Sequence, residues 1–252
     1  VVWALNERGF DDILVTDFLG KGSDKFKNLV GLRFDDYLEA DCFINQLEES
    51  SSAFADVSVI FHLGACSSTT ERNNRYLIEN NYEYTKRLAH WAVERGVRFL
   101  YASSAATYGD GKQGMLDEEG SLSDLRPLNM YGYSKHLFDL YAQRHGLLKN
   151  IVGLKYFNVF GPNENHKGDM RSLVNKAFYQ IKETGRVELF KSYNSHYRDG
   201  EQRRDFLYIK DAVAMTLYLA EEEALSGLFN VGSGKANTWI DLVTPIFHAM
   251  NK

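Results

Sequence analysis

Short apolar runs alternate with amphipathic stretches along much of the chain. The runs at 12–17, 57–63, 97–103 and 151–156 are rich in Val, Ile, Leu, Phe and Tyr, a composition typical of parallel strands buried on both faces. The stretch at about 75–95 carries apolar residues at helical spacing and predicts a helix between two of these strands. Strands that alternate with helices indicate an α/β fold with a doubly wound parallel sheet.

The pattern changes after the run Asn158–Pro162. The segment 163–204 is polar and charged, with one predicted helix near 170–184, whereas 205–233 returns to apolar helix and strand. This change of composition predicts a large sheet domain followed by a smaller lobe. The predicted domains are residues 1–160, with 205–233 also packed on them, and a smaller substrate-binding lobe over 161–252.

The beginning of the chain bears on the fold. The first residues predict the second half of an amphipathic helix that ends at Gly9, and the strand at 12–17 ends in Asp17. In a Rossmann-like dinucleotide-binding sheet, an acid at the end of the second strand holds the adenosine ribose, about 20 residues after a glycine-rich turn. We therefore expect the first strand and the glycine-rich turn to be missing here. The last residues predict a helix that runs to Lys252, so we also expect the lobe to be truncated at its C-terminus.

Composition narrows the class of protein. The 252 residues are 44% hydrophobic, and 34 acidic against 29 basic residues give a net charge of −5, which disfavours nucleic-acid binding. Cys42 and Cys66 are too few for a disulfide framework or a metal cluster. No apolar run approaches the roughly 18 residues of a membrane span. We expect a cytoplasmic protein with no metal, no nucleic-acid partner and no membrane segment.

The segment Tyr-Gly-Tyr-Ser-Lys at 131–135 carries the candidate chemistry. Tyr131 and Lys135 are four residues apart, so on a helix they share one face. A phenol ordinarily has a pKa of about 10, and an ammonium group beside it would lower that pKa. A hydroxyl proton must move when a hydride leaves a sugar alcohol. The pair therefore predicts hydride chemistry at an alcohol or ketone.

A second motif, Ser-Ser-Ala-Ala-Thr-Tyr-Gly at 103–109, follows an apolar strand. Together with Tyr131 and Lys135, it resembles the extended short-chain dehydrogenase/reductase superfamily, in which Ser104 would complete the catalytic group. Dehydratases of that superfamily carry an Asp-Glu pair directly after the corresponding hydroxyl residue. Two alanines follow Ser104 here, so β-elimination would have no obvious acid and base.

Several longer stretches narrow the resemblance further, and Arg203 and Arg204 stand where guanidinium groups would bind a nucleotide sugar's diphosphate. The chain resembles the ADP-L-glycero-D-manno-heptose 6-epimerase family, within the NAD-dependent epimerase/dehydratase family, from Trp3 to about residue 240. The most specific stretches are Gly-Ala-Cys-Ser-Ser-Thr-Thr-Glu at 64–71, Tyr101–Gly109, Pro127–Lys135 and His-Lys-Gly-Asp-Met at 166–170.

The resemblance implies an epimerisation at C6″ of ADP-D-glycero-D-manno-heptose for the heptose of lipopolysaccharide cores, by transient oxidation and re-reduction with bound NADP. It implies that Tyr131 and Lys167 exchange protons on the two sides of the reacting carbonyl. Ser104 would polarise the oxygen, and Lys135 would tune Tyr131 and hold the nicotinamide ribose. The implied cofactor contacts are Asp17, Phe18, Lys25, Leu63, Gly64, Ala65, Cys66, Ser67, Asn80, Tyr131, Lys135, Val159 and His166. The implied substrate contacts are Ser104, Asn158, Asp169, Lys176, Phe190, Lys191, Ser192 and Arg204.

Three points stay open at this level. Lys25 suits the additional phosphate of NADP, but Asp17 favours NAD, so NAD is a possible cofactor too. Another nucleotide-sugar epimerase or a one-way reductase would use the same motifs, and a non-catalytic dinucleotide-binding protein is a further alternative. The resemblance also implies a homo-oligomer.

Overall fold

The computed structural model describes residues 1–20, 23–49, 51–193 and 195–252. Asn194, in the polar loop of the expected lobe, lies outside these residues. The chain forms two compact units: Val1–Tyr156 with Val213–Asn230, and Phe157–Ala212 with Val231–Lys252. Both units are discontinuous, because the chain leaves the first unit after Tyr156 and returns to it at Val213.

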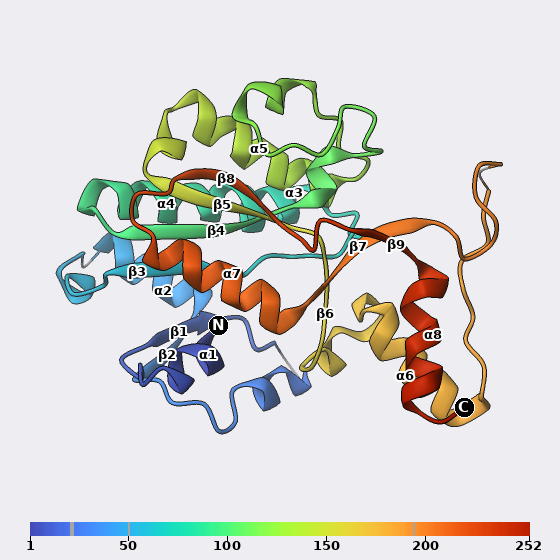
Figure 1. The fold of residues 1–252 in the computed structure, drawn as a ribbon. Helices are drawn as coiled ribbons and strands as arrows, with labels where there is room; N and C mark the ends of the chain where they lie inside the picture. The colour runs from blue at the N-terminus through green and yellow to red at the C-terminus, as the bar shows by residue number, and fades with distance from the viewer. Residues whose placement is uncertain (21–22, 50, 194) are drawn as a thin grey trace. The chain divides into compact units, whose positions relative to one another are not determined.

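The first unit contains two sheets (Figure 1). In the larger sheet β4 pairs in parallel with both β3 and β5, and its strands are almost fully buried in the centre, where Phe99, Leu100 and Tyr101 are at most 1% exposed. The α/β fold with parallel strands that the sequence predicts is confirmed. The larger sheet has the order β3 (Val59–His62), β4 (Arg98–Ser104), β5 (Ile151–Tyr156), β8 (Gly227–Val231), and the smaller one pairs β1 (Leu14–Asp17) in parallel with β2 (Asp36–Glu39).

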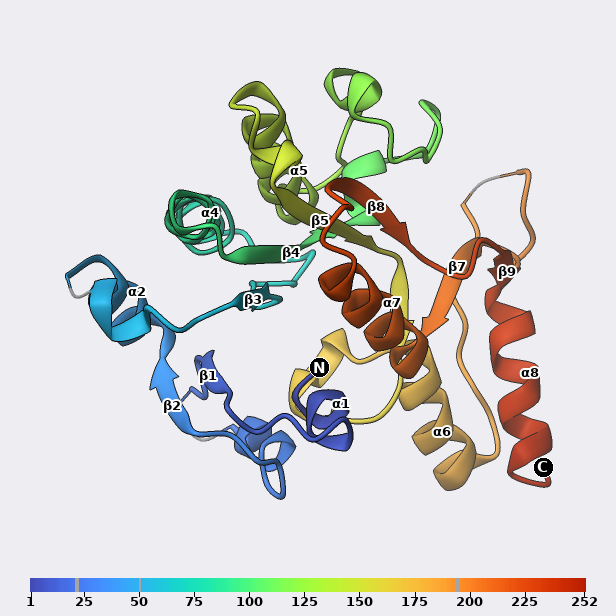
Figure 2. The same ribbon diagram turned by 60° about the vertical axis from the view of Figure 1, so that its left-hand side comes forward.

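Helices cover both faces of the larger sheet. In both ribbon views α4 and α5 lie on one face, and the part of α7 from Val213 onward lies on the other (Figures 1 and 2). Helix α4 ends at Gly96, whose φ of 67° is the left-handed conformation of a helix C-cap. No helix in the described ranges is both long and apolar enough to span a bilayer. The helices of this unit are α1 (Val2–Glu7), α2 (Ala40–Glu49), α3 (Asn74–Leu77), α4 (Tyr84–Arg95), α5 (Met130–Arg144) and the part of α7 (Ile209–Glu221) from Val213 onward, and a π-helical turn, Ile78–Glu83, joins α3 to α4.

The second unit combines a small sheet with two helices. Strand β7 pairs in parallel with β6 and antiparallel with β9. Helix α6 begins at the N-cap Ser172, and α8 begins with a capping box between Thr238 and Asp241, so both helix starts have their backbone N–H groups satisfied. The elements are β6 (Asn158–Phe160), α6 (Leu173–Thr184), β7 (Arg203–Tyr208), β9 (Ala236–Thr238) and α8 (Trp239–Ala249).

Some elements differ from the sequence prediction. The apolar pattern did not predict β2 or α2, because β2 has only four residues and exposes both of its ends. The helix predicted at 75–95 contains the π-helical turn rather than being a continuous α-helix. The terminal helix does not run to Lys252, because α8 ends at Ala249 and the Met250 backbone caps it.

Candidate active site

The carboxyl end of β4 carries the predicted serine. The Ser104 hydroxyl accepts a hydrogen bond from the Ala106 backbone N–H at 3.1 Å. This local bond starts the 3₁₀ turn Ala105–Tyr108. Ser104 is 7% exposed, so the turn holds its hydroxyl in a nearly closed environment.

Helix α5 brings the Tyr-Gly-Tyr-Ser-Lys segment against this turn. The N-cap Asn129 accepts a hydrogen bond from the Gly132 N–H at 2.8 Å, which places Tyr131 in the first turn of the helix. Gly132 lies so close to the strand-end turn that an added Cβ would stand 2.7 Å from the Ala106 carbonyl oxygen. Only a glycine therefore allows the start of α5 to approach Ser104 this closely.

The hydroxyl of Ser104 lies close enough to the phenol of Tyr131 to lower the pKa of that phenol. Burial raises the pKa of Tyr131 above its usual 10, the Ser104 hydroxyl opposes that rise, and the charge of Cys66 adds to it. The sequence predicted a lowered pKa for this phenol, whereas burial raises it. Spacing puts Lys135 on the same helix face, and its effect on the phenol stays a prediction.

Lys135 is a buried cation without an ion-pair partner among the described residues. Its side chain is 3% exposed, and within the described ranges its Nζ makes no hydrogen bond or ion pair. Burial lowers the pKa of Lys135 to about 8, against a smaller opposing effect of Asp139. A buried ammonium without a hydrogen-bond acceptor is costly, so this group fits a ligand that supplies hydroxyl oxygens, as a nicotinamide ribose does.

The cost of burying Lys135 leads to a prediction for stability. A pKa lowered from 10.5 to about 8 corresponds to about 3 kcal/mol, so Lys135→Met should raise the free energy of unfolding by about that amount at neutral pH. The wild type regains stability as pH rises from about 8 toward 10.5, where the unfolded chain binds the extra proton. Chemical denaturation across this pH range checks both statements, with Lys149→Met as the exposed-lysine control. A pH-independent difference between the two proteins would contradict them.

The contact at Gly132 leads to a prediction for activity. Gly132→Ala should push the start of α5 away from Ala106 and separate Tyr131 from Ser104. A displacement of about 1 Å in a catalytic group can cost about 10²-fold in rate, and we expect a loss of this order in turnover. Gly120→Ala is the control, because its added methyl group would meet no atom within 4 Å. Unchanged turnover in the Gly132 variant would show that this contact does not set the geometry.

The segment after β3, predicted to contact the cofactor from Leu63 to Ser67, is held by Asn81. Asn81 is 1% exposed, accepts from the Cys66 N–H at 2.9 Å and donates to the Cys66 carbonyl oxygen at 3.0 Å. It also donates to the Ser134 hydroxyl on α5 at 3.1 Å. Asn81 thus links the segment after β3 to α5.

Sequence reasoning selected Asn80 and missed Asn81. Asn80 is half-buried, and its amide donates to Asn81 Oδ1 at 3.0 Å. Both residues lie in the π-helical turn, and such insertions are frequent at functional sites. The adjacent asparagines were visible in the sequence, but the π turn that directs Asn81 inward was not.

At the carboxyl end of β1, the predicted adenosine contacts are brought together. Lys25 Nζ lies 2.5 Å from Asp17 Oδ1 and donates to the Phe18 carbonyl oxygen at 2.8 Å. The Phe18 N–H donates to the same Asp17 oxygen at 2.7 Å. The two residues that pointed to different cofactors are thus ion-paired with each other.

The remaining predicted residues lie in the second unit. Lys167 and His166 stand in the 3₁₀ segment Asn165–Met170, and Lys167 is exposed. The buried carboxylate of Glu164 organises this segment, because it accepts hydrogen bonds from the Gly161 N–H at 2.9 Å and from the Ser172 hydroxyl at 2.8 Å. The segment that carries Lys167 is therefore held by hydrogen bonds on both of its sides.

The predicted substrate contacts are distributed over this unit. Lys176 donates to the Asp169 carbonyl oxygen at 2.6 Å, so these two are in contact. Asn158 lies on β6 and donates to the Asp205 carbonyl oxygen at 3.1 Å. The other substrate contacts of this unit are Phe190, Lys191 and Ser192 in the loop after α6, and Arg204 on β7. Val159, a predicted cofactor contact, also lies on β6.

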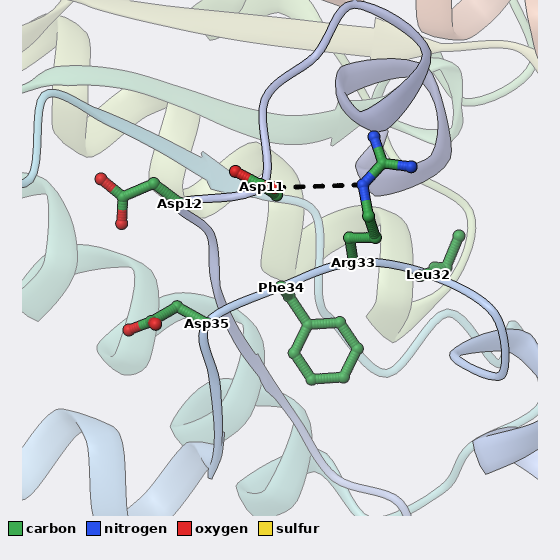
Figure 3. A pocket seen from close by; sticks show the side chains of 6 residues that line it. All are labelled: Asp11, Asp12, Leu32, Arg33, Phe34 and Asp35. Atoms are coloured by element: carbon green, nitrogen blue, oxygen red, sulfur yellow. Dashed lines mark ion pairs between the residues drawn. The ribbon is translucent and has the colours of Figure 1, made fainter.

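A separate hollow of about 570 Å³ opens at the amino ends of β1 and β2, the opposite end of these strands from Asp17. Arg33 reaches toward Asp11 at 4.0 Å (Figure 3). The Arg33 backbone is fixed by the Asn6 side chain of α1, so this arrangement holds α1 in place. The lining residues are Asp11, Asp12, Leu32, Arg33, Phe34 and Asp35.

Comparison with known proteins tests the family. The model of the NAD dependent epimerase/dehydratase family matches residues 4–232. The ADP-L-glycero-D-manno-heptose-6-epimerase of Nitratidesulfovibrio vulgaris (strain DP4) is 50% identical over 252 residues, which cover 100% of this chain and 77% of that protein. The chain belongs to the ADP-L-glycero-D-manno-heptose-6-epimerases of this family. The resemblance inferred from its motifs is confirmed.

Other members of the 6-epimerase family are also similar to this chain in sequence and in fold. The protein of that name from Fusobacterium nucleatum is 43% identical over 244 residues, covering 96% of this chain and 73% of its own length. The crystal structure of the 6-epimerase from Helicobacter pylori has a TM-score of 0.80 at 28% identity, covering 100% of this chain and 78% of its own. A UDP-glucose 4-epimerase from Thermotoga maritima has a TM-score of 0.75 at 22% identity, which shows the shared fold alone.

Proposed function

We propose that this 6-epimerase inverts C6″ of ADP-D-glycero-D-manno-heptose to the L-glycero epimer and supplies heptose for lipopolysaccharide cores. The observation that carries the proposal is the site of the first unit. There the Ser104 hydroxyl acts on the Tyr131 phenol and lowers its pKa, and the buried Lys135 on the same helix makes no hydrogen bond or ion pair in the described ranges. The 50% identity to a protein named for this activity supports the substrate.

Tyr131 is the proton carrier on one side of the reacting carbon. A bound nicotinamide dinucleotide would supply the acceptor and donor of the hydride at C6″. Because its pKa is raised, Tyr131 is protonated at neutral pH and can donate to a ketone oxygen. Ser104 would donate a hydrogen bond to the same ketone oxygen. The reverse transfer needs a positive charge that favours the phenolate, and Lys135, one helical turn away, is protonated below its pKa of about 8.

Lys167 is the proton carrier that we propose for the other epimer. A hydride that returns to the opposite face of the ketone leaves the oxygen on the opposite side, so a second acid/base group is needed. Lys167 is exposed in a loop fixed by the buried Glu164. Such a loop can present an ammonium group to a bound substrate without losing its own shape.

We propose NADP as the cofactor. The family description names NAD, and an acid at the end of the second strand ordinarily binds the ribose hydroxyl of that cofactor. Here the ammonium of Lys25 lies 2.5 Å from the carboxylate of Asp17, so the acid is neutralised. A neutralised acid beside a lysine removes the repulsion that would otherwise act on a 2′-phosphate.

The substrate contacts that we propose are the side chains of the second unit already described: Asn158, Asp169, Lys176, Phe190, Lys191, Ser192 and Arg204. Arginine and lysine suit the diphosphate of a nucleotide sugar. The homo-oligomer implied by the resemblance stays a prediction.

The proposed activity is tested with ADP-D-glycero-D-manno-heptose and a catalytic amount of NADP, with a parallel reaction that contains NAD. We expect the L-glycero epimer to accumulate without net cofactor reduction, and faster with NADP. In a separate reaction with stoichiometric NADPH, conversion that consumes one equivalent of the reduced cofactor would identify a reductase instead. Absence of any product with either cofactor would refute the proposal.

A further inference from the structure

A buried ion pair lies beneath the residues of the proposed site. The side chains of Asp139 on α5 and Lys155 on β5 are both fully buried, and Lys155 Nζ is 2.7 Å from Asp139 Oδ2. Removing two charges from water is expensive unless each is paired and hydrogen-bonded. Such a pair in the centre of a fold therefore needs an explanation.

Both charges have further partners. The Asp139 carboxylate also accepts from the Tyr101 hydroxyl at 2.8 Å and from the Ser103 hydroxyl at 2.7 Å. Lys155 also donates to the Thr107 hydroxyl at 2.9 Å. Gly153 is part of this arrangement, because an added Cβ there would stand 2.5 Å from the Tyr101 hydroxyl oxygen. A polar network with every member satisfied fixes one arrangement of the elements that it joins.

These elements are the ones that carry the proposed catalytic groups. Asp139 lies one helical turn after Lys135 on the same face of α5. Lys155 is paired in register with Ser103, the residue before Ser104. Thr107 donates to the Ser104 carbonyl oxygen at 2.8 Å. The ion pair is thus connected to Ser104 on one side and to Lys135 on the other.

Two lysines compete for one carboxylate in this region. Lys135 is close enough to Asp139 for the carboxylate to raise its pKa, although burial dominates. Lys155 holds the hydrogen bond to Asp139, whereas Lys135 makes none within the part of the chain described. The position of Lys155 therefore decides which of the two lysines is neutralised.

Other ionisable groups around Lys135 do not supply a competing charge at neutral pH. Burial lowers the pKa of His62 to about 3 and raises the pKa of Tyr101 well above its usual 10, so both are uncharged. Burial also lowers the pKa of His136. The groups around Lys135 and the ion pair include His62 on β3, Tyr101 on β4, Lys155 on β5, and Tyr131, His136 and Asp139 on α5. The Tyr108 ring lies against Lys155, Glu119 acts on Tyr101 and Arg126 acts on His136, whereas Asp139 is the charge that acts on Lys135.

We propose that Asp139 and Lys155 are positioning residues for the reaction: Lys155 neutralises Asp139, so that Lys135 is left without a protein counter-ion and remains available to the cofactor and to Tyr131. The catalytic part of this inference rests on the proposed function. The electrostatic part does not, and it makes a prediction that involves neither substrate nor cofactor.

The titration of Lys135 tests the proposal directly. Carbon-13-labelled lysine allows the pKa of Lys135 to be followed by NMR, with the signal assigned from Lys135→Met. Lys155→Met leaves an uncompensated carboxylate and should raise the pKa by about one unit or more. Asp139→Asn leaves an uncompensated ammonium and should lower it by a similar amount. The double variant should return the pKa to within a few tenths of a unit of the wild-type value.

The proposal requires the pKa of Lys135 to shift in opposite directions in Lys155→Met and Asp139→Asn. If the two residues only stabilised the fold, the sign of the shift would not depend on which charge is removed. Shifts in the same direction, or no shift in either, would overturn it. If the single variants do not fold, Ser103→Ala should raise the pKa and Thr107→Val should lower it, since each removes one partner of one charge. Lys112→Met breaks the exposed pair with Asp110 and should leave Lys135 unchanged; a comparable shift there would also overturn the proposal.

The pH profile of turnover separates this inference from the proposed function. The alkaline limb should move to higher pH in Lys155→Met and to lower pH in Asp139→Asn, in step with the pKa of Lys135. If the NMR shifts occur but the wild type does not epimerise ADP-heptose, the proposed function fails and the electrostatic inference stands. If epimerisation occurs without opposite NMR shifts, the inference fails and the proposed function stands.

Discussion

Tyr131→Phe is expected to lower the rate of epimerisation by about 10²–10⁴-fold, the range that a general acid/base group contributes. The phenol is the group on which the Ser104 hydroxyl acts, and phenylalanine keeps the ring but cannot carry a proton. Because the ring that packs against the site is retained, the free energy of unfolding should change little. Steady-state turnover of ADP-D-glycero-D-manno-heptose by the purified variant measures the effect.

The matched control is Tyr133→Phe, two residues further along the same helix. Tyr133 is 45% exposed, and loss of its hydroxyl should leave turnover within a factor of about two, as expected for a surface substitution. Wild-type turnover in Tyr131→Phe, with Ser104 intact, would remove the phenol from the mechanism. Equal losses in both variants would indicate a general effect on α5.

Lys167→Ala is expected to lower the rate of epimerisation by about 10²–10⁴-fold, as in Tyr131→Phe. Unlike that variant, it should leave hydride transfer from one epimer intact. In the proposed function Tyr131 and Ser104 serve that epimer, and both belong to the first unit of the fold. A single-turnover experiment with excess enzyme should show reduced cofactor by its absorbance, while no inverted product forms.

Lys182→Ala provides the comparison for Lys167, because Lys182 is an exposed lysine of α6 in the same unit. It should retain full epimerase activity. Inversion at the wild-type rate in Lys167→Ala would exclude Lys167 as the second proton carrier. Loss of hydride transfer as well would show that this lysine acts in binding rather than in proton exchange.

Much of the fold could be predicted from the chain because its signals are local. The apolar run Ile151–Tyr156 is a strand over that same range, and Gly96 ends a helix where a left-handed residue is needed. Strand β2 could not be predicted, since four residues with two exposed ends carry no clear period. Its place beside β1 depends on pairing with residues about 20 positions earlier.

The candidate site, too, was predictable from the sequence only in part. The motif residues Ser104, Tyr131 and Lys135 were found by type and spacing, and the family that they indicate is confirmed by the match over residues 4–232. Spacing suggested that Lys135 lowers the pKa of the Tyr131 phenol, whereas burial raises that pKa. A four-residue interval defines a shared helix face, but it does not define the distance between two side-chain ends.

The sequence by itself determined the fold class, the family and the residue types able to move a proton beside a hydride acceptor. Only the tertiary structure decided which charges are neutralised. It pairs Lys25 with Asp17 and Lys155 with Asp139, and it leaves the buried Lys135 without a hydrogen-bond partner in the described ranges. The reason is physical: propensity and period are properties of neighbouring residues, whereas burial and ion pairing depend on side chains that folding brings together from distant parts of the chain.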